Sequence, residues 1–227
     1  MRFFSNFAGT LCLIALLAGC SENKTTETTQ QESVAPSETA TAARGEPTIL
    51  FFGNSLTAGY GVEPSEAFPA LVQDKLDSLG LSYKVVNAGV SGETTSGGNS
   101  RIDWVLRQPV DVFVLELGGN DGLRGIPLTE TRQNLQAIMD KVKAKYPAAK
   151  IILAGMQIPP SMGRTYATEF RDLYTELAEE NDVTLIPFLL EGVGGIRDLN
   201  QADGIHPTPE GHRIVAGNVW EVLANEL

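Results

Sequence analysis

Cysteine and histidine are both scarce in this 227-residue sequence, which contains two of each. The cysteines, Cys12 and Cys20, lie near the N-terminus, and no spacing of the metal-finger kind occurs. The rest of the chain therefore has no disulfide to brace it, and its fold must rest on a buried apolar core. With 42% hydrophobic residues, the chain is long enough to form one domain with such a core.

Positively charged residues are also few. The chain has 17 lysine and arginine residues against 28 aspartate and glutamate residues, which gives a formal net charge of -11 at pH 7. A chain of this sign repels the phosphate backbone, and the sequence contains no basic stretch that would offset the repulsion. We therefore expect no nucleic acid partner.

The N-terminal segment carries one positive charge, at Arg2, followed by an uncharged apolar stretch that ends at Cys20. This stretch is too short and too abruptly ended for a membrane span, and its layout is that of a secretory signal. The sequence "LAGC" (Leu17–Cys20) resembles the signal of bacterial lipoproteins, in which the cysteine is lipidated and becomes the new N-terminus. We expect a signal peptide over residues 1–19 and an exported, membrane-anchored lipoprotein. The alternative is an ordinary signal peptide in which the cysteine occurs by chance.

Residues 20–47 follow this signal. After Cys20 they are rich in serine, threonine and glutamate, without aromatic residues or apolar periodicity. Such a composition cannot bury enough surface to order itself. We interpret the segment as a flexible tether that spans on the order of 30 Å by the scaling of flexible linkers. An N-terminal arm with no spacing role has the same composition and is the alternative.

From residue 48 onward, short apolar runs alternate with stretches whose apolar residues recur every three or four positions. The runs predict buried parallel strands, and the stretches predict helices that pack on them. This alternation is typical of a parallel sheet covered on both faces, with ligands at the carboxyl ends of the strands. In one domain over residues 48–227 we predict strands at Thr48–Phe52, Tyr83–Ala88, Asp111–Leu117, Lys150–Gly155 and Val183–Phe188, and helical stripes through residues 68–79, 135–142, 170–177 and 215–223.

Ser55 lies in "GNSL", in a turn that directly follows the first predicted strand. A serine in such a turn is usually a cap or a turn residue, because its hydroxyl satisfies backbone donors. A nucleophilic serine needs a base, a third group that orients the base, and donors for the oxyanion. Ser55 is a candidate nucleophile only if the rest of the chain supplies these groups.

The candidate base is His206, in the glycine- and proline-rich stretch "ADGIHP". Asp203 precedes it by three residues, a spacing that lets one turn bring the carboxylate to the imidazole. Asp203 as an ordinary turn cap is the alternative. The other histidine, His212, starts the last helical stripe, and we expect it in a first helical turn or on the surface.

Two further stretches follow predicted strands and offer oxyanion donors. Asn120, in "GGND", has a side-chain amide, and Gly92, in "SGET", has no side chain to block close approach of its backbone N–H. On its own, "GGND" is more often a turn, because Gly, Asn and Asp all favour turns. Ser91 lies close to a Gly-x-Ser-x-Gly pattern, but Glu93 occupies the position of the last glycine, so we reject Ser91 as the nucleophile.

In this order, "GNSL", "SGET", "GGND" and "DGIH" resemble the blocks of SGNH hydrolases of the GDSL type, and within them the thioesterase I, lysophospholipase L1 and arylesterase group. The resemblance implies a flavodoxin-like three-layer α/β/α sandwich with a five-stranded parallel sheet, and no metal or organic cofactor. It implies Ser55 as nucleophile, His206 as base and Asp203 as the acid that orients the base. The oxyanion hole would comprise the backbone N–H groups of Ser55 and Gly92 and the side-chain amide of Asn120.

One position departs from the family pattern, which usually has aspartate before the nucleophile where this chain has Asn54. Asparagine has nearly the same shape, but it brings two donors and no charge. Because that aspartate is not the triad acid of the family, we expect the hydrogen bonds of the loop to change and the reaction to survive.

The resemblance implies a serine esterase that acts on small acyl esters, thioesters or lysolipids through an acyl-enzyme. The loop "GLRGIPL" carries Ile126 and Leu128, which we expect to line an acyl channel; an ordinary surface loop is the alternative. Two other functions stay open. One is a carbohydrate O-acetylesterase with an open polar cleft, and the other is a catalytically silent binding lipoprotein on a hydrolase fold.

Overall fold

The computed structural model of the protein describes residues 45–227. Within them, five parallel strands form one sheet in the order β2-β1-β3-β4-β5. The predicted strands are confirmed, with ends that differ by one or two residues. They are β1 (Thr48–Gly53), β2 (Lys84–Gly89), β3 (Val112–Glu116), β4 (Lys150–Ala154) and β5 (Thr184–Ile186). The expected signal peptide, Cys20 and nearly all of the expected tether lie outside the described residues.

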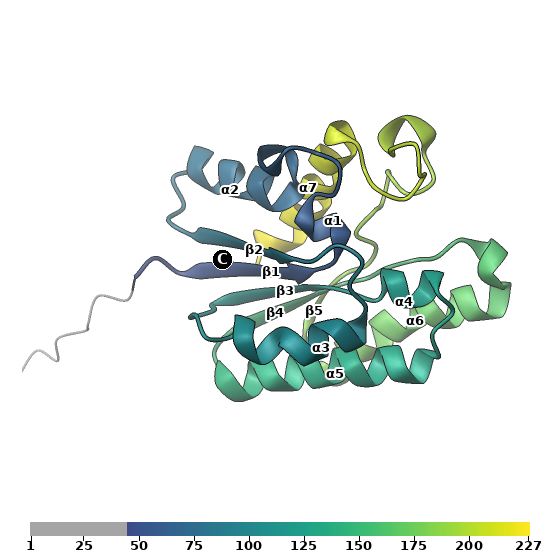
Figure 1. The fold of residues 1–227 in the computed structure, drawn as a ribbon. Helices are drawn as coiled ribbons and strands as arrows, with labels where there is room; N and C mark the ends of the chain where they lie inside the picture. Colours follow the sequence, from purple (N-terminus) through teal and green to yellow (C-terminus); the bar gives the residue numbers. More distant parts are fainter. Residues whose placement is uncertain (1–44) are drawn as a thin grey trace, which may run out of the picture. The chain divides into compact units, whose positions relative to one another are not determined.

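Helices cover both faces of the sheet, so the predicted three-layer arrangement is confirmed. Figure 1 shows α2 (Phe68–Ser78) and α7 (Pro209–Leu223) on one face, and α3 (Thr95–Val105), α5 (Leu128–Lys145) and α6 (Arg164–Asn181) on the other. The remaining helical segments are short: α1 (Ser55–Ala58), α4 (Gly119–Leu123) and the 3₁₀ turns Pro64–Glu66, Pro160–Met162 and Arg197–Leu199. None of the helices in residues 45–227 is long and apolar enough to cross a membrane.

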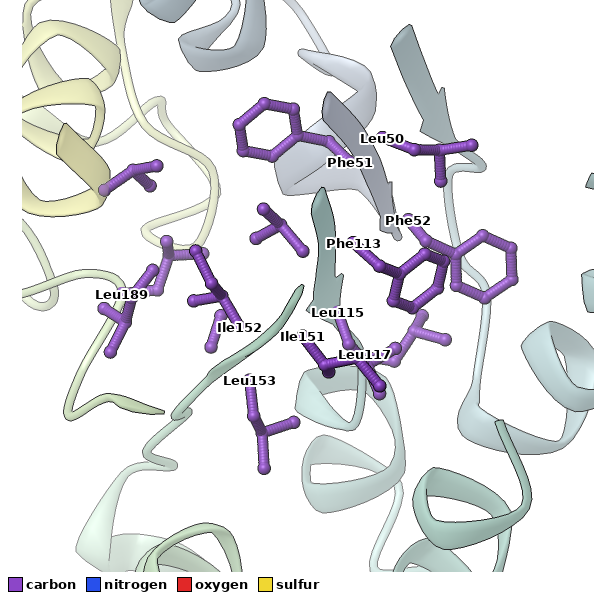
Figure 2. Close-up of a cluster of buried hydrophobic side chains, with 14 of the residues drawn as sticks. Leu50, Phe51, Phe52, Phe113, Leu115, Leu117, Ile151, Ile152, Leu153 and Leu189 are labelled. Atoms are coloured by element: carbon purple, nitrogen blue, oxygen red, sulfur yellow. The ribbon is translucent and has the colours of Figure 1, made fainter. Parts of the chain in front are cut away.

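The core lies on both faces of the central strands, whose side chains alternate between them. Figure 2 shows Phe51 and Phe52 leaving β1 in opposite directions. Phe51 packs edge-on against Phe68 of α2 with ring centroids 5.5 Å apart, and Phe52 packs against Phe113 of β3 at 5.6 Å. Burying each of these side chains contributes about 1.5–3 kcal/mol. A core of this kind fixes the ends of β1 and β3, where polar loops begin.

Helix α3 is absent from the pattern of predicted helices. It contains "SGGNS" (Ser96–Ser100), whose residues are poor helix formers. This run also interrupts any apolar stripe, so the sequence does not predict a helix here. The side chain of Thr94 caps it by accepting a hydrogen bond from the N–H of Gly97 at 3.3 Å. A Cβ at Gly98 would overlap the side chain of Leu117 and would lie in tight contact with Phe52. The glycine thus lets α3 lie close to the sheet.

Candidate active site

Ser55 is the first residue of α1 and directly follows Asn54, which links β1 to the helix. The Asn54 side chain caps α1, because its Oδ1 accepts the N–H of Leu56 at 2.9 Å. Gly59 ends this single turn in the left-handed region, at φ 75°. The serine is therefore held between a capped N-terminus and a glycine C-cap, with 8% of its surface exposed.

His206 lies within hydrogen-bond distance of Ser55, although 151 residues separate them in the chain. The Ser55 Oγ to His206 Nε2 distance is 2.8 Å, and His206 Nδ1 is 2.6 Å from Asp203 Oδ2. With Nδ1 donating its hydrogen to the carboxylate, Nε2 is the acceptor that faces the serine hydroxyl. The three side chains thus have the mutual geometry that proton removal from Ser55 requires.

Asp203 is held in its own loop as well as against the imidazole. Its Oδ1 accepts the backbone N–H groups of Ile205 at 2.9 Å and of His206 at 3.0 Å. The hydrogen bond from His206 and these backbone bonds lower the pKa of Asp203 to about 2. The carboxylate therefore stays ionised throughout the neutral range, and it holds the imidazole in one orientation.

The loop that carries His206 is held against the segment that follows Ser55. Gln201 Nε2 donates to the carbonyl oxygens of Tyr60 at 2.7 Å and Pro207 at 3.0 Å. The Tyr60 ring lies against the His206 ring, with centroids 4.6 Å apart. The segments after β1 and before α7 are thereby fastened to each other next to Ser55.

The three expected oxyanion donors all follow strands of the sheet at its carboxyl edge. In residues 45–227, the backbone N–H groups of Ser55 and Gly92 have no hydrogen-bond acceptor. Asn120 Nδ2 donates one hydrogen to the carbonyl oxygen of Glu93 at 2.9 Å, which leaves the second hydrogen of that amide available. Gly92 has φ 80°, a conformation that suits glycine, and a Cβ there would meet only Arg124 Nη2, at 4.0 Å.

Two arginines hold the loop that carries Gly92. Arg101 forms an ion pair with Glu93, donates to the carbonyl oxygen of Ala88 at 2.8 Å and lies over the ring of Phe52. Arg124 donates to the carbonyl oxygen of Gly92 at 3.0 Å. Because Glu93 also accepts the Asn120 amide, the loop and Asn120 are fixed together.

A pocket of about 430 Å³ opens beside the serine. Ser55, Asn120 and His206 are among its polar lining residues. Most of its wall is apolar, with Leu123, Met156, Ile158, Phe188, Leu190 and Ile205 among the lining residues. A wall of this composition favours an apolar group of a bound molecule.

One expectation from the sequence is wrong. Ile126 and Leu128 do not line the pocket; of this loop only Leu123, the last residue of α4, does. His212 lies in the first turn of α7 as expected, but it is buried with 1% exposure, and its Nδ1 accepts the N–H of Phe68 at 3.3 Å. Packing of α7 against the segment before α2 covers it.

Ser91, which the sequence excluded, is exposed on the loop beside Gly92. Within residues 45–227, no group of three or more histidine, cysteine, aspartate or glutamate side chains is arranged to hold a metal ion.

Sequence reasoning missed Glu116, whose carboxylate is fully buried behind the turn that carries Ser55. The signal was present, because this acidic residue ends the apolar run "VFVLE" of β3. A carboxylate at the end of a buried strand is rarely tolerated without partners. Its partners, Asn54 and Thr57, are about sixty residues away in the chain and are not visible in a local pattern.

Comparison with known proteins gives consistent matches. Residues 51–214 match the GDSL-like Lipase/Acylhydrolase family. Esterase TesA of Pseudomonas aeruginosa is 41% identical over 177 residues, which cover 78% of this chain and 87% of that protein. Thioesterase 1/protease 1/lysophospholipase L1 of Escherichia coli is 41% identical over 175 residues, which cover 77% and 82%. A crystal structure of TesA matches with a TM-score of 0.75 at 41% identity, covering 79% of this chain and 99% of that chain.

The matched region runs from β1 into α7 and contains all of the candidate site residues: Ser55, Gly92, Asn120, Asp203 and His206. The fold, the family match and the similarity to both relatives agree. The chain belongs to the GDSL-like lipase/acylhydrolase family and has the fold of the SGNH hydrolases.

Proposed function

We propose that this protein is a serine esterase that hydrolyses carboxylic esters or thioesters of apolar acyl groups. The observation that carries the proposal is the pair Ser55 Oγ and His206 Nε2, 2.8 Å apart in the lining of a mostly apolar pocket. The names of two relatives support the same reaction class: one is named an esterase, and the other a thioesterase and lysophospholipase.

In the first half of the reaction, Ser55 Oγ attacks the carbonyl carbon while its proton passes to His206 Nε2. Asp203 stabilises the imidazolium that forms. The carbonyl oxygen becomes an oxyanion, which the N–H groups of Ser55 and Gly92 and the free amide hydrogen of Asn120 would bind. Collapse of this intermediate breaks the bond to the leaving group, an alkoxide or thiolate, which takes the proton from His206.

The second half repeats these steps with water. His206 Nε2 takes a proton from a water molecule as the water oxygen attacks the acyl-enzyme carbonyl. The new tetrahedral intermediate collapses with Ser55 Oγ as the leaving group, and the proton returns to the serine. A carboxylic acid leaves the pocket, and the free enzyme is restored without any cofactor.

The wall of the pocket supports an acyl group longer than acetyl. Met156, Ile158 and Phe188 present apolar surface beside the nucleophile, and burial of each methylene contributes about 0.8 kcal/mol. A carbohydrate O-acetylesterase needs an open polar cleft for its sugar, and this wall disfavours that alternative. A silent binding protein is disfavoured because the nucleophile, base and acid are all present at hydrogen-bond distances.

The test is hydrolysis of p-nitrophenyl acetate, butyrate, octanoate and palmitate by the full-length protein in detergent. Ser55→Ala is measured in parallel, and Ser91→Ala is the matched control because Ser91 is exposed nearby. We expect a maximum at butyrate or octanoate, loss of activity in Ser55→Ala, and activity near wild type in Ser91→Ala. Activity on acetate alone would favour the deacetylase. Absence of Ser55-dependent hydrolysis for every ester would favour the binding protein.

We also propose that Cys20 is lipidated and anchors the protein to a membrane. The support is the sequence "LAGC" at the end of the apolar N-terminal stretch. The test is incorporation of a labelled fatty acid in cells that express the full chain. We expect Cys20→Ala to abolish labelling and Cys12→Ala to retain it. Equal labelling of the two variants would overturn the assignment.

A further inference from the structure

A buried carboxylate lies directly behind the turn that carries Ser55. Glu116 is the last residue of β3, and the sheet register pairs it with Gly53, the last residue of β1. Its surface is 0% exposed. A Cβ at position 53 would overlap the Glu116 carboxylate and the Thr57 hydroxyl, so glycine there permits the approach. The end of the sheet is therefore built around this side chain.

Within residues 45–227, all the polar partners of the Glu116 carboxylate come from the turn Asn54–Thr57, here called the nucleophile turn. One oxygen, Oε2, accepts the backbone N–H of Asn54 at 3.0 Å and the hydroxyl of Thr57 at 2.8 Å. The other oxygen, Oε1, accepts the side-chain amide Nδ2 of Asn54 at 2.6 Å. Asn54 and Thr57 flank Ser55 and Leu56, so one carboxylate binds the turn on both sides of the nucleophile.

The Asn54 amide can satisfy its neighbours in only one orientation. With Nδ2 toward Glu116, its Oδ1 accepts the N–H of Leu56 at 2.9 Å and lies 3.3 Å from Ser55 Oγ. Rotating the amide by half a turn would place Nδ2 against the Leu56 N–H, so that two donors would face each other. We propose that Glu116 is a positioning residue for the nucleophile, and that it acts by fixing the orientation of the Asn54 side chain.

Protonation of Glu116 leaves this arrangement intact. Burial raises its pKa to about 7, and the nearby titratable side chain Tyr174 stays neutral because burial raises its own pKa. A proton on Oε2 can be donated to Thr57 Oγ1, since a hydroxyl is also an acceptor. Oε1 still accepts the Asn54 amide, and the protonated oxygen still accepts the Asn54 N–H. The turn therefore keeps its geometry in both states.

Glutamine at position 116 has no such solution. If its NH₂ group replaces Oε1, it faces the NH₂ group of Asn54; if it replaces Oε2, it faces the backbone N–H of Asn54. One buried donor is left against another in either case. Turning the Asn54 amide relieves the first conflict only by breaking the cap on Leu56. We expect Glu116→Gln to misplace Ser55.

A second substitution removes the conflict. In Asn54→Asp/Glu116→Gln, the glutamine NH₂ donates to one aspartate oxygen, and the other aspartate oxygen accepts the Leu56 N–H. The glutamine carbonyl accepts the backbone N–H at position 54 and the Thr57 hydroxyl. Every hydrogen bond of the original site is replaced, and the negative charge moves from position 116 to position 54. The amide and the carboxylate thus exchange places, and this exchange tests the role of Glu116.

The experiment uses the full-length protein and p-nitrophenyl butyrate, with kcat, KM and Tm measured for each variant. Glu116→Gln should lower kcat by about tenfold or more with KM changed by less than about threefold, and the double variant should return kcat to within about threefold of wild type. Asp121→Asn is the matched control. Asp121 is also a buried carboxylate, but it is bonded to Thr95, so Asn54→Asp should not restore the losses caused by Asp121→Asn.

Two results would overturn the inference: a Glu116→Gln enzyme with kcat near wild type, or a double variant no better than the single one. Because the inference rests on the proposed esterase activity, wild type and Ser55→Ala are measured first. If no Ser55-dependent hydrolysis occurs, the proposed function fails, and the pairing is still judged by Tm. A Tm that falls in Glu116→Gln and recovers in the double variant supports the pairing, and a Tm that does not recover refutes it. If Glu116→Gln does not fold, recovery of folding in the double variant is the same test.

Discussion

His212 makes the stability of this protein depend on pH between 4 and 6.5 in a way that can be measured. The side chain is 1% exposed, and its Nδ1 accepts the backbone N–H of Phe68, which it can do only while Nδ1 carries no proton. Its Nε2 is buried without a hydrogen-bond partner in the described part of the chain. Burial lowers the pKa of His212 from 6.5 to about 4.

The direction of the effect follows from these two values. Because the pKa in the folded state is the lower one, the unfolded chain binds the proton first as the pH falls. Stability is complete above pH 6.5, declines below it, and levels off below about pH 4. Each pKa unit is worth about 1.4 kcal/mol, so His212 should remove about 2–3 kcal/mol of unfolding free energy between about pH 7.5 and about pH 4.5.

The assay is denaturant unfolding of wild type and His212→Gln at those two pH values. Glutamine cannot titrate, and its carbonyl can accept the Phe68 N–H, so the variant should lack this part of the pH dependence. Carboxylates elsewhere in the chain titrate in the same range. Their contribution is common to both proteins, so it cancels when the pH dependence of the unfolding free energy is compared between wild type and His212→Gln. An identical pH dependence for the two proteins would falsify the assignment. His212→Asn provides the same comparison if the glutamine variant is too unstable.

Three substitutions in the site give further predictions, each measured on p-nitrophenyl butyrate. Asn120→Ala should lower kcat by about 10²–10³ while Tm stays near wild type, because one oxyanion donor is lost; turnover near wild type would exclude that role. Asp203→Asn should lower kcat by roughly 10³–10⁴, because an amide NH₂ facing His206 Nδ1 favours the tautomer that cannot accept the serine proton. Retained activity would show that Asp203 does not set the tautomer. Asn54→Asp should change kcat/KM by less than about tenfold at neutral pH, because a proton shared with Glu116 preserves the cap on α1. A larger gain would mean that Asn54 impairs the present site.

Much of the fold can be read from the sequence because the signals are local. A fully buried strand such as Ile49–Phe52 is apolar at every position, and an amphipathic helix repeats its apolar residues along one stripe. The Asp203–His206 contact is also local, since a single turn joins the two residues. Ser55 was placed with them because parallel strands deliver their following loops to one edge of the sheet.

The features that the sequence did not reveal depend on contacts between distant segments. Helix α3 has poor helix formers, and Gly98 lets it pack closely against Leu117 and Phe52. The burial of His212 depends on where α7 meets the segment before α2. The pocket wall takes Phe188 and Leu190 from the chain after β5, far from the loop that was expected to supply it.

The sequence by itself determined the strands, the parallel sheet and the small set of polar residues that gather at its carboxyl edge. The tertiary structure decided how those residues are held. Strand register brings Glu116 beside Gly53. Because Glu116 accepts the Asn54 amide, the hydrogen bonds around Ser55 can form in only one arrangement. Periodicity reports which side of an element is apolar, whereas the partner of a buried polar atom depends on the path of the whole chain.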